Sequence, residues 1–315
     1  MAYAWLASRR PLFEGGWGDE ALLAAAEEAT FSSPPPAAAT PRFGPARKRG
    51  GVWVREGSFP SPELRLSGPV ATAHVRWLTG SWTPGDTCAL LLAGSREEGF
   101  ALREAVHRPS VQAGVDLVLL ENPFSGLRRA VGQPTAAVRT VSEHLLLNLA
   151  MLQEARALLG WAARTGYTFR AVAGYSMGGF MAALVAGLSP EPLAVAALAA
   201  GTTPAPVYTR GLLSRSVDFR ALAKGRAGEA WARKRLASLF GLADAKRLPP
   251  PVRPQAAVVL GCLLDGYVSQ EDTRALHAHW PGSTLRWLDA GHVSAPLFHR
   301  AELRRATADA LSGLR

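Results

Sequence analysis

Cysteine is scarce in this chain, with only Cys88 and Cys262 among 315 residues. Both lie in apolar runs that predict central strands, the third and the seventh of a sheet. Two intervening strands would hold them roughly 14 Å apart, whereas a disulfide needs Cα atoms within about 7 Å. We therefore expect two buried thiols. The Cys and His spacing also matches no metal-ligand pattern, so we expect neither zinc nor another metal or cofactor.

Long apolar runs are absent as well, since no stretch of about 18 uninterrupted apolar residues occurs. We therefore do not expect an integral membrane protein. The first 16 residues, MAYAWLASRRPLFEGG, carry two arginines after a short apolar piece and no small-residue cleavage pattern, so no secretory signal is predicted. So short a stretch is also compatible with a mitochondrial presequence. The richness in Ala, Arg, Gly and Pro indicates a GC-rich bacterial genome and favours the cytoplasm.

Positive charge is in excess, with 35 Lys and Arg against 25 Asp and Glu and a net charge of +10. The basic residues cluster at 45–51, 127–130 and 220–237. Nucleic acid is not the expected partner, because neither stacking aromatics nor a known binding module accompanies the charges. Two interpretations stay open: an ordinary solvated surface, or attraction to an acidic substrate or an anionic membrane at its periphery.

Strands and helices alternate along the chain after residue 50. Apolar runs such as TAHVRWLT, TCALLLAG and VDLVLLEN predict strands, and a long helix is expected between about 134 and 165. This alternation predicts an α/β fold with a mostly parallel, eight-stranded sheet, helices on both faces and antiparallel opening strands. A chain with 48% hydrophobic residues can bury one large core of this kind.

Two segments stand apart from this alternation. Residues 1–50 predict a short helix at 19–29 and an extended Pro-rich arm from 30, ahead of the domain that spans 51–315. Residues 202–255 form an excursion with a helical middle and a PPPVRP exit. Because this excursion is too long for a simple crossover, it predicts a helical cap.

A GxSxG motif carries the main functional signal. An apolar strand from residue 169 runs into Gly174-Tyr175-Ser176-Met177-Gly178, and an alanine-rich helix follows. This is the pattern of the nucleophile elbow of an α/β-hydrolase, in which a serine stands on a tight strand-to-helix turn and its neighbours must lack side chains. The alternative is a glycine-rich turn of a Rossmann-like sheet with an incidental serine.

The expected chain order of a catalytic triad places an acid and a histidine after Ser176. His292 follows a last predicted strand, and Gly291 lets the loop turn back toward the serine. Asp265 ends the preceding apolar run and is the expected acid; its rival Asp289 is better placed to cap the turn. The remaining histidines fall inside predicted strands or helices: His74, His107, His144, His277, His279 and His299.

An oxyanion hole would need two further donors. One is the backbone amide of Met177, the first residue of the helix after the elbow. The other is expected from Gly94 or Ser95, in the loop that follows the third strand. The alternative for this loop is an ordinary strand-to-helix turn.

At this point the sequence resembles the α/β-hydrolase domain-containing protein 18 family. The matching segments lie in order along most of the chain: GGWGD (15–19), LLLAG (90–94), LLENPFSG (119–126), GYSMGGFMAAL (174–184), RGLLSRSVDFRAL (210–222) and HWPGSTLRWLDAGHVSAPLF (279–298). The resemblance implies that Ser176, Asp265 and His292 match the family's triad and that Gly94 belongs to its oxyanion loop. The loop itself departs from the family's Thr-Gly-Asp-His, because residues 95–98 here read Ser-Arg-Glu-Glu.

These features predict a serine hydrolase that acts on a carboxylic ester, with lipid esters preferred. The mixture of Trp231, Leu236, Leu239 and Phe240 with basic residues in the predicted cap suits a fatty acyl chain beside an anionic group. Two alternatives stay open: a thioesterase or peptidase with the same triad, and a binding protein that keeps the fold without turnover.

Overall fold

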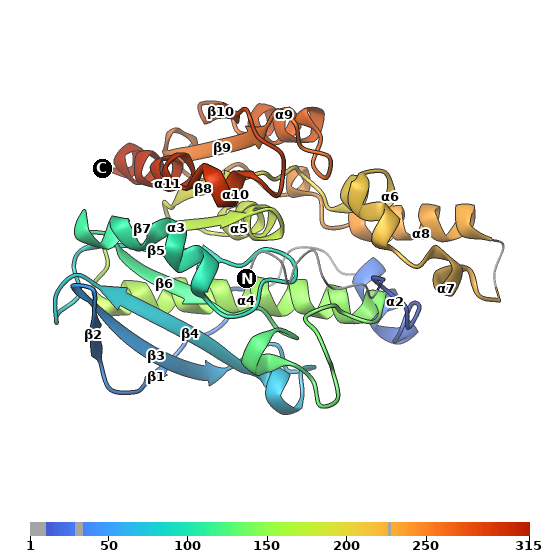
Figure 1. Cartoon of the computed structure of the whole chain (residues 1–315), viewed down its shortest axis with the longest axis horizontal. Coiled ribbons are helices and arrows are strands. Elements are labelled where there is room, and N and C mark those ends of the chain that lie inside the picture. The colour runs from blue at the N-terminus through green and yellow to red at the C-terminus, as the bar shows by residue number, and fades with distance from the viewer. Residues whose placement is uncertain (1–10, 29–33, 226–227) are drawn as a thin grey trace.

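The computed structural model describes residues 11–28, 34–225 and 228–315, and in them a ten-stranded sheet forms the centre of the molecule (Figure 1). Its strands are β1 (Arg42–Phe43), β2 (Arg47–Arg49), β3 (Val52–Pro60), β4 (Thr72–Thr79), β5 (Thr87–Leu92), β6 (Asp116–Leu120), β7 (Phe169–Tyr175), β8 (Ala194–Leu198), β9 (Ala257–Cys262) and β10 (Thr284–Leu288). The predicted α/β fold is confirmed.

The sheet follows the order β1-β3-β4-β6-β5-β7-β8-β9-β10, with β2 paired to β3. The pairs β6–β5, β5–β7, β7–β8, β8–β9 and β9–β10 are parallel. The opening strands pair antiparallel, as the sequence predicted. The eight predicted strands correspond to β3 to β10. The two additional strands are short and come from the segment predicted as an extended arm, which pairs along the edge strand β3.

Helices connect the strands and extend beyond them. They are α2 (Glu20–Glu28), α3 (Ala101–Gln112), α4 (Val141–Thr165), α5 (Met177–Gly187), α6 (Ala205–Thr209), α7 (Phe219–Ala223), α8 (Glu229–Gly241), α9 (Gln270–His279), α10 (Ala295–Phe298) and α11 (Arg300–Leu314). The long helix α4 begins later than predicted, because Thr140 and Glu143 form a capping box that fixes its first turn. Within the described ranges, no helix combines the length and the apolar composition needed to cross a lipid bilayer.

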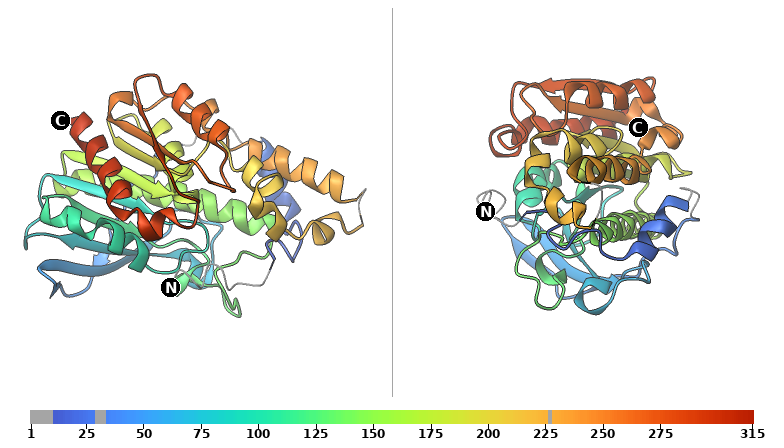
Figure 2. Two further views of the ribbon diagram at one scale, coloured as in Figure 1. Left: turned by 45° about the horizontal axis from the view of Figure 1, so that its top comes forward. Right: turned by 90° about the vertical axis from the view of Figure 1, so that its right-hand side faces the viewer.

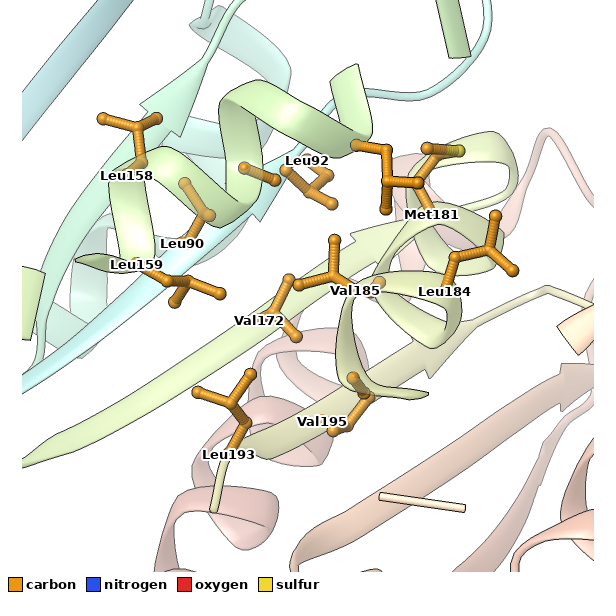
Figure 3. Close-up of a cluster of buried hydrophobic side chains, with 14 of the residues drawn as sticks. Leu90, Leu92, Leu158, Leu159, Val172, Met181, Leu184, Val185, Leu193 and Val195 are labelled. Carbon is orange, nitrogen blue, oxygen red and sulfur yellow. The ribbon is translucent and has the colours of Figure 1, made fainter. Parts of the chain in front are cut away.

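Two apolar layers separate the sheet from its helices. Residues of α4, α5 and α9 pack on one face, and residues of α3 and α11 pack on the other. Figure 3 shows the first layer, where Met181 and Val185 of α5 lie against Val172 of β7 and the neighbouring strands. Cys88 on β5 and Cys262 on β9 are buried free thiols separated by β7 and β8, as expected.

The segment that contains α6, α7 and α8 projects beyond the sheet and lies beside α2 (Figures 1 and 2). Trp17 connects the two regions, because its indole nitrogen donates to the Leu222 carbonyl at 2.8 Å and its ring packs edge-on against Trp231. Leu12 also pairs with Val217 in a parallel bridge. Leu12 and Trp17 therefore pack against the predicted cap. The domain boundary near residue 50 stays a prediction.

A buried ion pair fixes α4 to the loop after β6. Arg128 and Glu154 have fully buried side chains, and their two hydrogen bonds measure 2.6 and 2.8 Å. Arg128 also donates to the backbone carbonyls of Val70 and Glu121, so one guanidinium joins three segments. Such a pair tolerates the loss of one partner poorly, because the remaining charge stays out of water.

We therefore expect Glu154→Gln to destabilise the fold by about 3 to 5 kcal/mol, since Arg128 would keep a buried charge without a counter-charge. The double replacement Arg128→Met with Glu154→Leu removes both charges and should cost less than the single change. Denaturant unfolding of the three proteins provides the measurement. A single variant that is no less stable than the double variant would contradict this account.

Candidate active site

Ser176 lies on a strained turn between β7 and α5. Its backbone has φ 58° and ψ −120°, a region that non-glycine residues rarely adopt. The Ser176 amide donates to the Leu198 carbonyl on β8 at 2.8 Å, which holds the turn against the neighbouring strand. A strained serine fixed by its surroundings at the end of a strand has the geometry of a nucleophile elbow.

Close backbone approach explains the glycines on both sides of the serine. A Cβ atom at Gly174 would lie 2.3 Å from the backbone of Gly178, and a Cβ atom at Gly178 would lie 2.4 Å from the Leu92 carbonyl oxygen. Neither contact can be relieved by rotating a side chain, because the opposing atoms belong to the backbone. The turn therefore requires glycine at both positions.

His292 lies between Ser176 and Asp265 in one hydrogen-bonded chain. Its Nε2 atom is 2.8 Å from the serine Oγ, and its Nδ1 atom is 2.6 Å from Asp265 Oδ2. The side chains of His292 and Asp265 are only 5% and 1% exposed. Asp265 Oδ1 accepts from the amides of Tyr267 and Val268. Of the two candidate acids, Asp265 occupies the position beside the imidazole, whereas Asp289 is exposed to solvent.

Two tyrosines hold the histidine loop in place. The Tyr175 hydroxyl, at the end of the strand that carries the serine, donates to the His292 carbonyl at 2.6 Å. Burial raises the pKa of Tyr175, so this hydroxyl keeps its proton. The rings of Tyr175 and Tyr267 lie 5.2 and 4.8 Å from the imidazole. The orientation of His292 is thus set by its backbone contact, by Asp265 and by two neighbouring aromatic rings.

The structure separates the two candidates for the second oxyanion donor. The Gly94 amide already donates to the Glu97 carboxylate at 3.0 Å, and Arg103 holds that carboxylate from the other side at 2.8 Å. Ser95 lines the cavity beside the serine, together with Met177. Ser95 is therefore the better placed of these two candidates. The Met177 amide lies in the first turn of α5, so no preceding carbonyl of the helix accepts a hydrogen bond from it.

A small cavity that is partly open to solvent adjoins Ser176. One wall comes from α5, with Phe180, and another comes from the start of the predicted cap, with Val207 and Leu213. Residues 203–213 thus contribute directly to the cavity next to the serine. The walls are mainly apolar, which suits an aliphatic group of a ligand.

Two polar residues of α4 also line this cavity, and the sequence pattern did not single them out. His144 and Asn148 lie one helical turn apart and so share a face. Burial lowers the pKa of His144 to about 4, so its imidazole is neutral near pH 7. Asn148 Oδ1 is buried and has no hydrogen-bond partner among the described residues. Only their i, i+4 spacing could have suggested that they act together.

We expect the backbone strain at Ser176 to lower the free energy of unfolding. Ser176→Gly should be more stable than Ser176→Ala by about 1 kcal/mol, because glycine adopts this backbone region without the cost that alanine retains. The matched pair Ser238→Gly and Ser238→Ala, in the exposed middle of α8, should show the opposite order. Thermal and denaturant unfolding measure both differences, and the same order at both positions would contradict a strained turn.

Comparison with known proteins places the chain among hydrolase folds. Similar solved structures include acetyl xylan esterase 1 from Thermoanaerobacterium sp. JW/SL YS485, with TM-score 0.62, 15% identity and 97% of each chain covered. Another is the acetyl xylan esterase from Paenibacillus sp. R4, with TM-score 0.55, 16% identity and 91% of this chain and 92% of that chain covered. At such identities the likeness shows the fold. The family model described as alpha/beta hydrolase domain containing 18 matches residues 10–236 and 226–313, so the chain belongs to that family.

Proposed function

We propose that this protein is a serine hydrolase that cleaves a carboxylic ester through an acyl-enzyme intermediate. The observation that carries the proposal is the hydrogen-bonded chain from Ser176 through His292 to Asp265, which ends at a serine facing a cavity. Nucleophile, base and orienting acid are each within hydrogen-bond distance of the next, which is the arrangement that serine activation requires.

The mechanism follows from these contacts. His292 Nε2 accepts the proton of the Ser176 hydroxyl as the oxygen attacks the ester carbonyl, and it then donates that proton to the leaving alkoxide. Asp265 accepts a hydrogen bond from Nδ1–H and stabilises the imidazolium that forms. Water then attacks the acyl-enzyme with His292 as the base. This second attack releases the carboxylic acid and restores the serine hydroxyl.

The negative charge that develops on the carbonyl oxygen needs preorganised donors. The Met177 amide at the start of α5 and the Ser95 amide are the proposed pair. Glu97 supports the loop rather than the oxyanion, because it holds the Gly94 amide and is itself held by Arg103. This three-residue arrangement gives the loop a fixed shape before substrate binds.

An aliphatic acyl or alcohol group is the expected occupant of the cavity. Its walls combine Phe180, Val207 and Leu213 with the polar atoms of His144 and Asn148. Lipid esters and smaller carboxylic esters both fit this description. The esterases with a similar fold support ester chemistry in general terms, although their identity to this chain is too low to indicate a substrate.

Two other functions use the same residues. A thioesterase or peptidase would need the same triad, so only a panel of matched ester, thioester and amide substrates separates these activities. A binding protein without turnover would leave the serine unreactive. Labelling by a fluorophosphonate probe that is lost in Ser176→Ala distinguishes an enzyme from such a protein.

We expect Ser176→Ala and His292→Ala each to lower kcat for an ester by roughly four to six orders of magnitude, because triad members act as a unit. Asp265→Asn should be milder, at about 10⁴-fold. The reason is that an asparagine NH₂ would donate to Nδ1 and force the Nε2–H tautomer, which cannot accept the serine proton. Steady-state kinetics with a chromogenic ester provides the measurement.

The exposed Asp289 supplies the matched control for the acid. Asp289→Asn removes a carboxylate in the same loop as His292 and should leave kcat within about threefold of the parent. Circular dichroism confirms that each variant is folded. Undiminished ester turnover in Ser176→Ala, or equal losses in Asp265→Asn and Asp289→Asn, would refute the proposed roles.

Peripheral contact with an anionic membrane is a further part of the proposal. Some basic residues of the cluster at 220–237 make contacts within the protein, which reduces the number that could bind a membrane. Arg233 stacks over Phe219 at 3.7 Å and donates to the Thr209 carbonyl. Arg235 pairs with Glu20 at 2.6 Å and lies over the ring of Trp17. Both therefore support the packing of this segment. Arg226, which belongs to the same predicted cluster, lies outside the described residues.

The membrane test therefore uses the exposed lysines of this segment, Lys224 and Lys234, and leaves both arginines intact. The double variant Lys224→Gln with Lys234→Gln should bind anionic vesicles more weakly than the parent, by about 1 kcal/mol per lysine. Added salt should weaken binding of the parent. Sedimentation with anionic and neutral vesicles measures this, and equal binding by parent and double variant would show that these lysines form an ordinary solvated surface.

A further inference from the structure

Asn122 is a buried amide that holds the backbone of the loop after β5. It belongs to the segment LLENPFSG (119–126), to which the proposed mechanism gives no role. The residue is 1% exposed, and its Nδ2 atom donates to the Gly94 carbonyl at 2.9 Å. Its Oδ1 atom is buried and has no hydrogen-bond partner among the described residues. Because a half-satisfied buried amide costs stability, the contact with Gly94 is the one to which a function can be assigned.

Gly94 is held at both of its backbone groups. Its amide donates to the Glu97 carboxylate at 3.0 Å, and Arg103 holds that carboxylate at 2.8 Å. Its carbonyl accepts from Asn122 and, at a longer 3.3 Å, from the Glu97 amide. Asn122 thus supplies the shorter hydrogen bond to this carbonyl. The orientation of the peptide group between Gly94 and Ser95 is therefore set largely by a side chain from another strand end.

That orientation determines where the Ser95 amide points. The described part of the chain contains no cis peptide bond, so the Gly94 carbonyl and the Ser95 N–H point in opposite directions from one planar group. Asn122 follows β6 and Ser176 follows β7, and β5 lies between these two strands (Figure 1). A Gly94 carbonyl directed toward Asn122 therefore directs the Ser95 N–H toward the side of the sheet that carries the nucleophile.

The loop after β5 also lies close to the elbow. A Cβ atom at Gly94 would lie 3.5 Å from the carbonyl oxygen of Tyr175, the residue before the nucleophile. Ser95 and Ser176 line the same cavity. An amide of this loop that points toward β7 can therefore reach a carbonyl oxygen bound beside the serine.

We propose that Asn122 is a positioning residue for the oxyanion hole: by binding the Gly94 carbonyl, it keeps the Ser95 N–H directed at the oxygen that becomes negative during acyl transfer. This inference rests on the proposed ester hydrolysis and adds a residue to that site. Asn122 does not line the cavity, so it acts only through the peptide group that it holds. A donor oriented before the reaction needs no reorganisation as charge develops, so its misorientation raises the energy of the transition state.

The first test replaces Asn122 by leucine, which keeps the volume, and by alanine, which leaves a cavity. Both changes remove the donor to Gly94. We expect each to lower kcat for a p-nitrophenyl ester by about 10- to 100-fold, less than the full loss of an oxyanion donor, because the Ser95 amide remains but is no longer oriented. KM should stay within about threefold, because the ground-state carbonyl uses this contact less than the oxyanion does.

Gln133→Leu is the matched control. Gln133 also donates from a side-chain amide to a backbone carbonyl in the loop after β6, that of Phe124 at 2.9 Å. Its loss should lower the free energy of unfolding while kcat stays within about threefold of the parent. A loss of kcat comparable to that of Asn122→Leu would show that any loosening of this loop slows the reaction, and the assignment to Asn122 would be wrong.

A pair of ketones separates charge stabilisation from general disorder of the site. Ser176 Oγ adds to the carbonyl carbon of an alkyl trifluoromethyl ketone, His292 takes the serine proton, and the ketone oxygen becomes an oxyanion. The corresponding methyl ketone stays a ketone. We expect Asn122→Leu to weaken inhibition by the trifluoromethyl ketone by about 10- to 100-fold, and inhibition by the methyl ketone by no more than about threefold. In the parent with isotope-labelled serine, the Ser95 amide proton should move downfield in the NMR spectrum when the trifluoromethyl ketone binds.

The outcomes separate this inference from the proposed function. If the parent hydrolyses the ester in a Ser176-dependent manner but both Asn122 variants keep the parent kcat, or change only KM, the positioning role is wrong and the hydrolase proposal stands. If the variants lose affinity equally for both ketones, the effect is structural and the role is again wrong. A Ser95 amide that does not respond to the trifluoromethyl ketone in the parent overturns the inference even where neither variant folds. If the parent hydrolyses no ester, the proposed function itself fails.

Discussion

The structure depends on the close approach of two backbones at the end of β7. Gly178, in the first turn of α5, lies so near the carbonyl oxygens of β5 that a Cβ atom there would fall 2.4 Å from the nearest one. Ser176 lies two residues before Gly178 in the same turn and has the strained conformation of φ 58° and ψ −120°. The apolar face of α5, with Met181 and Val185, then packs on β7 and its neighbours (Figure 3). Core packing thus offsets the strain and keeps the serine at the sheet edge.

The same strand also controls the histidine. Tyr175 directly precedes the serine at the end of β7. Its hydroxyl donates to the carbonyl of His292, which lies in a loop 117 residues later in the chain. Asp265 is fixed independently, through the amides of Tyr267 and Val268. The two hydrogen bonds of His292 therefore form between groups whose positions are already determined. Little reorganisation would be required on serine attack, which is the condition for effective electrostatic stabilisation.

Much of this arrangement could be predicted from the sequence because it follows from chain order. Parallel strands bring their carboxyl ends to one edge, so Ser176, Asp265 and His292 could be expected to meet although 116 residues separate the first from the last. His144 and Asn148 could not be predicted, because a helical pattern does not reveal which face borders a cavity. The arm also gave no strand signal, since β1 and β2 span only two and three residues and are held by pairing with β3. Arg235 pairs with Glu20, which lies 215 residues away in the sequence, so the clustering of basic residues could not reveal this contact.

The cavity beside Ser176 combines apolar walls with a few polar side chains. On the side of α4 and the cap, the cavity is apolar and its imidazole is neutral, because burial lowers the pKa of His144 to about 4. A buried neutral imidazole and an amide can exchange hydrogen bonds with a ligand but offer no charge to an anion. Because these polar groups share the cavity with the serine, hydrogen bonding and substrate shape would act together to orient the scissile bond.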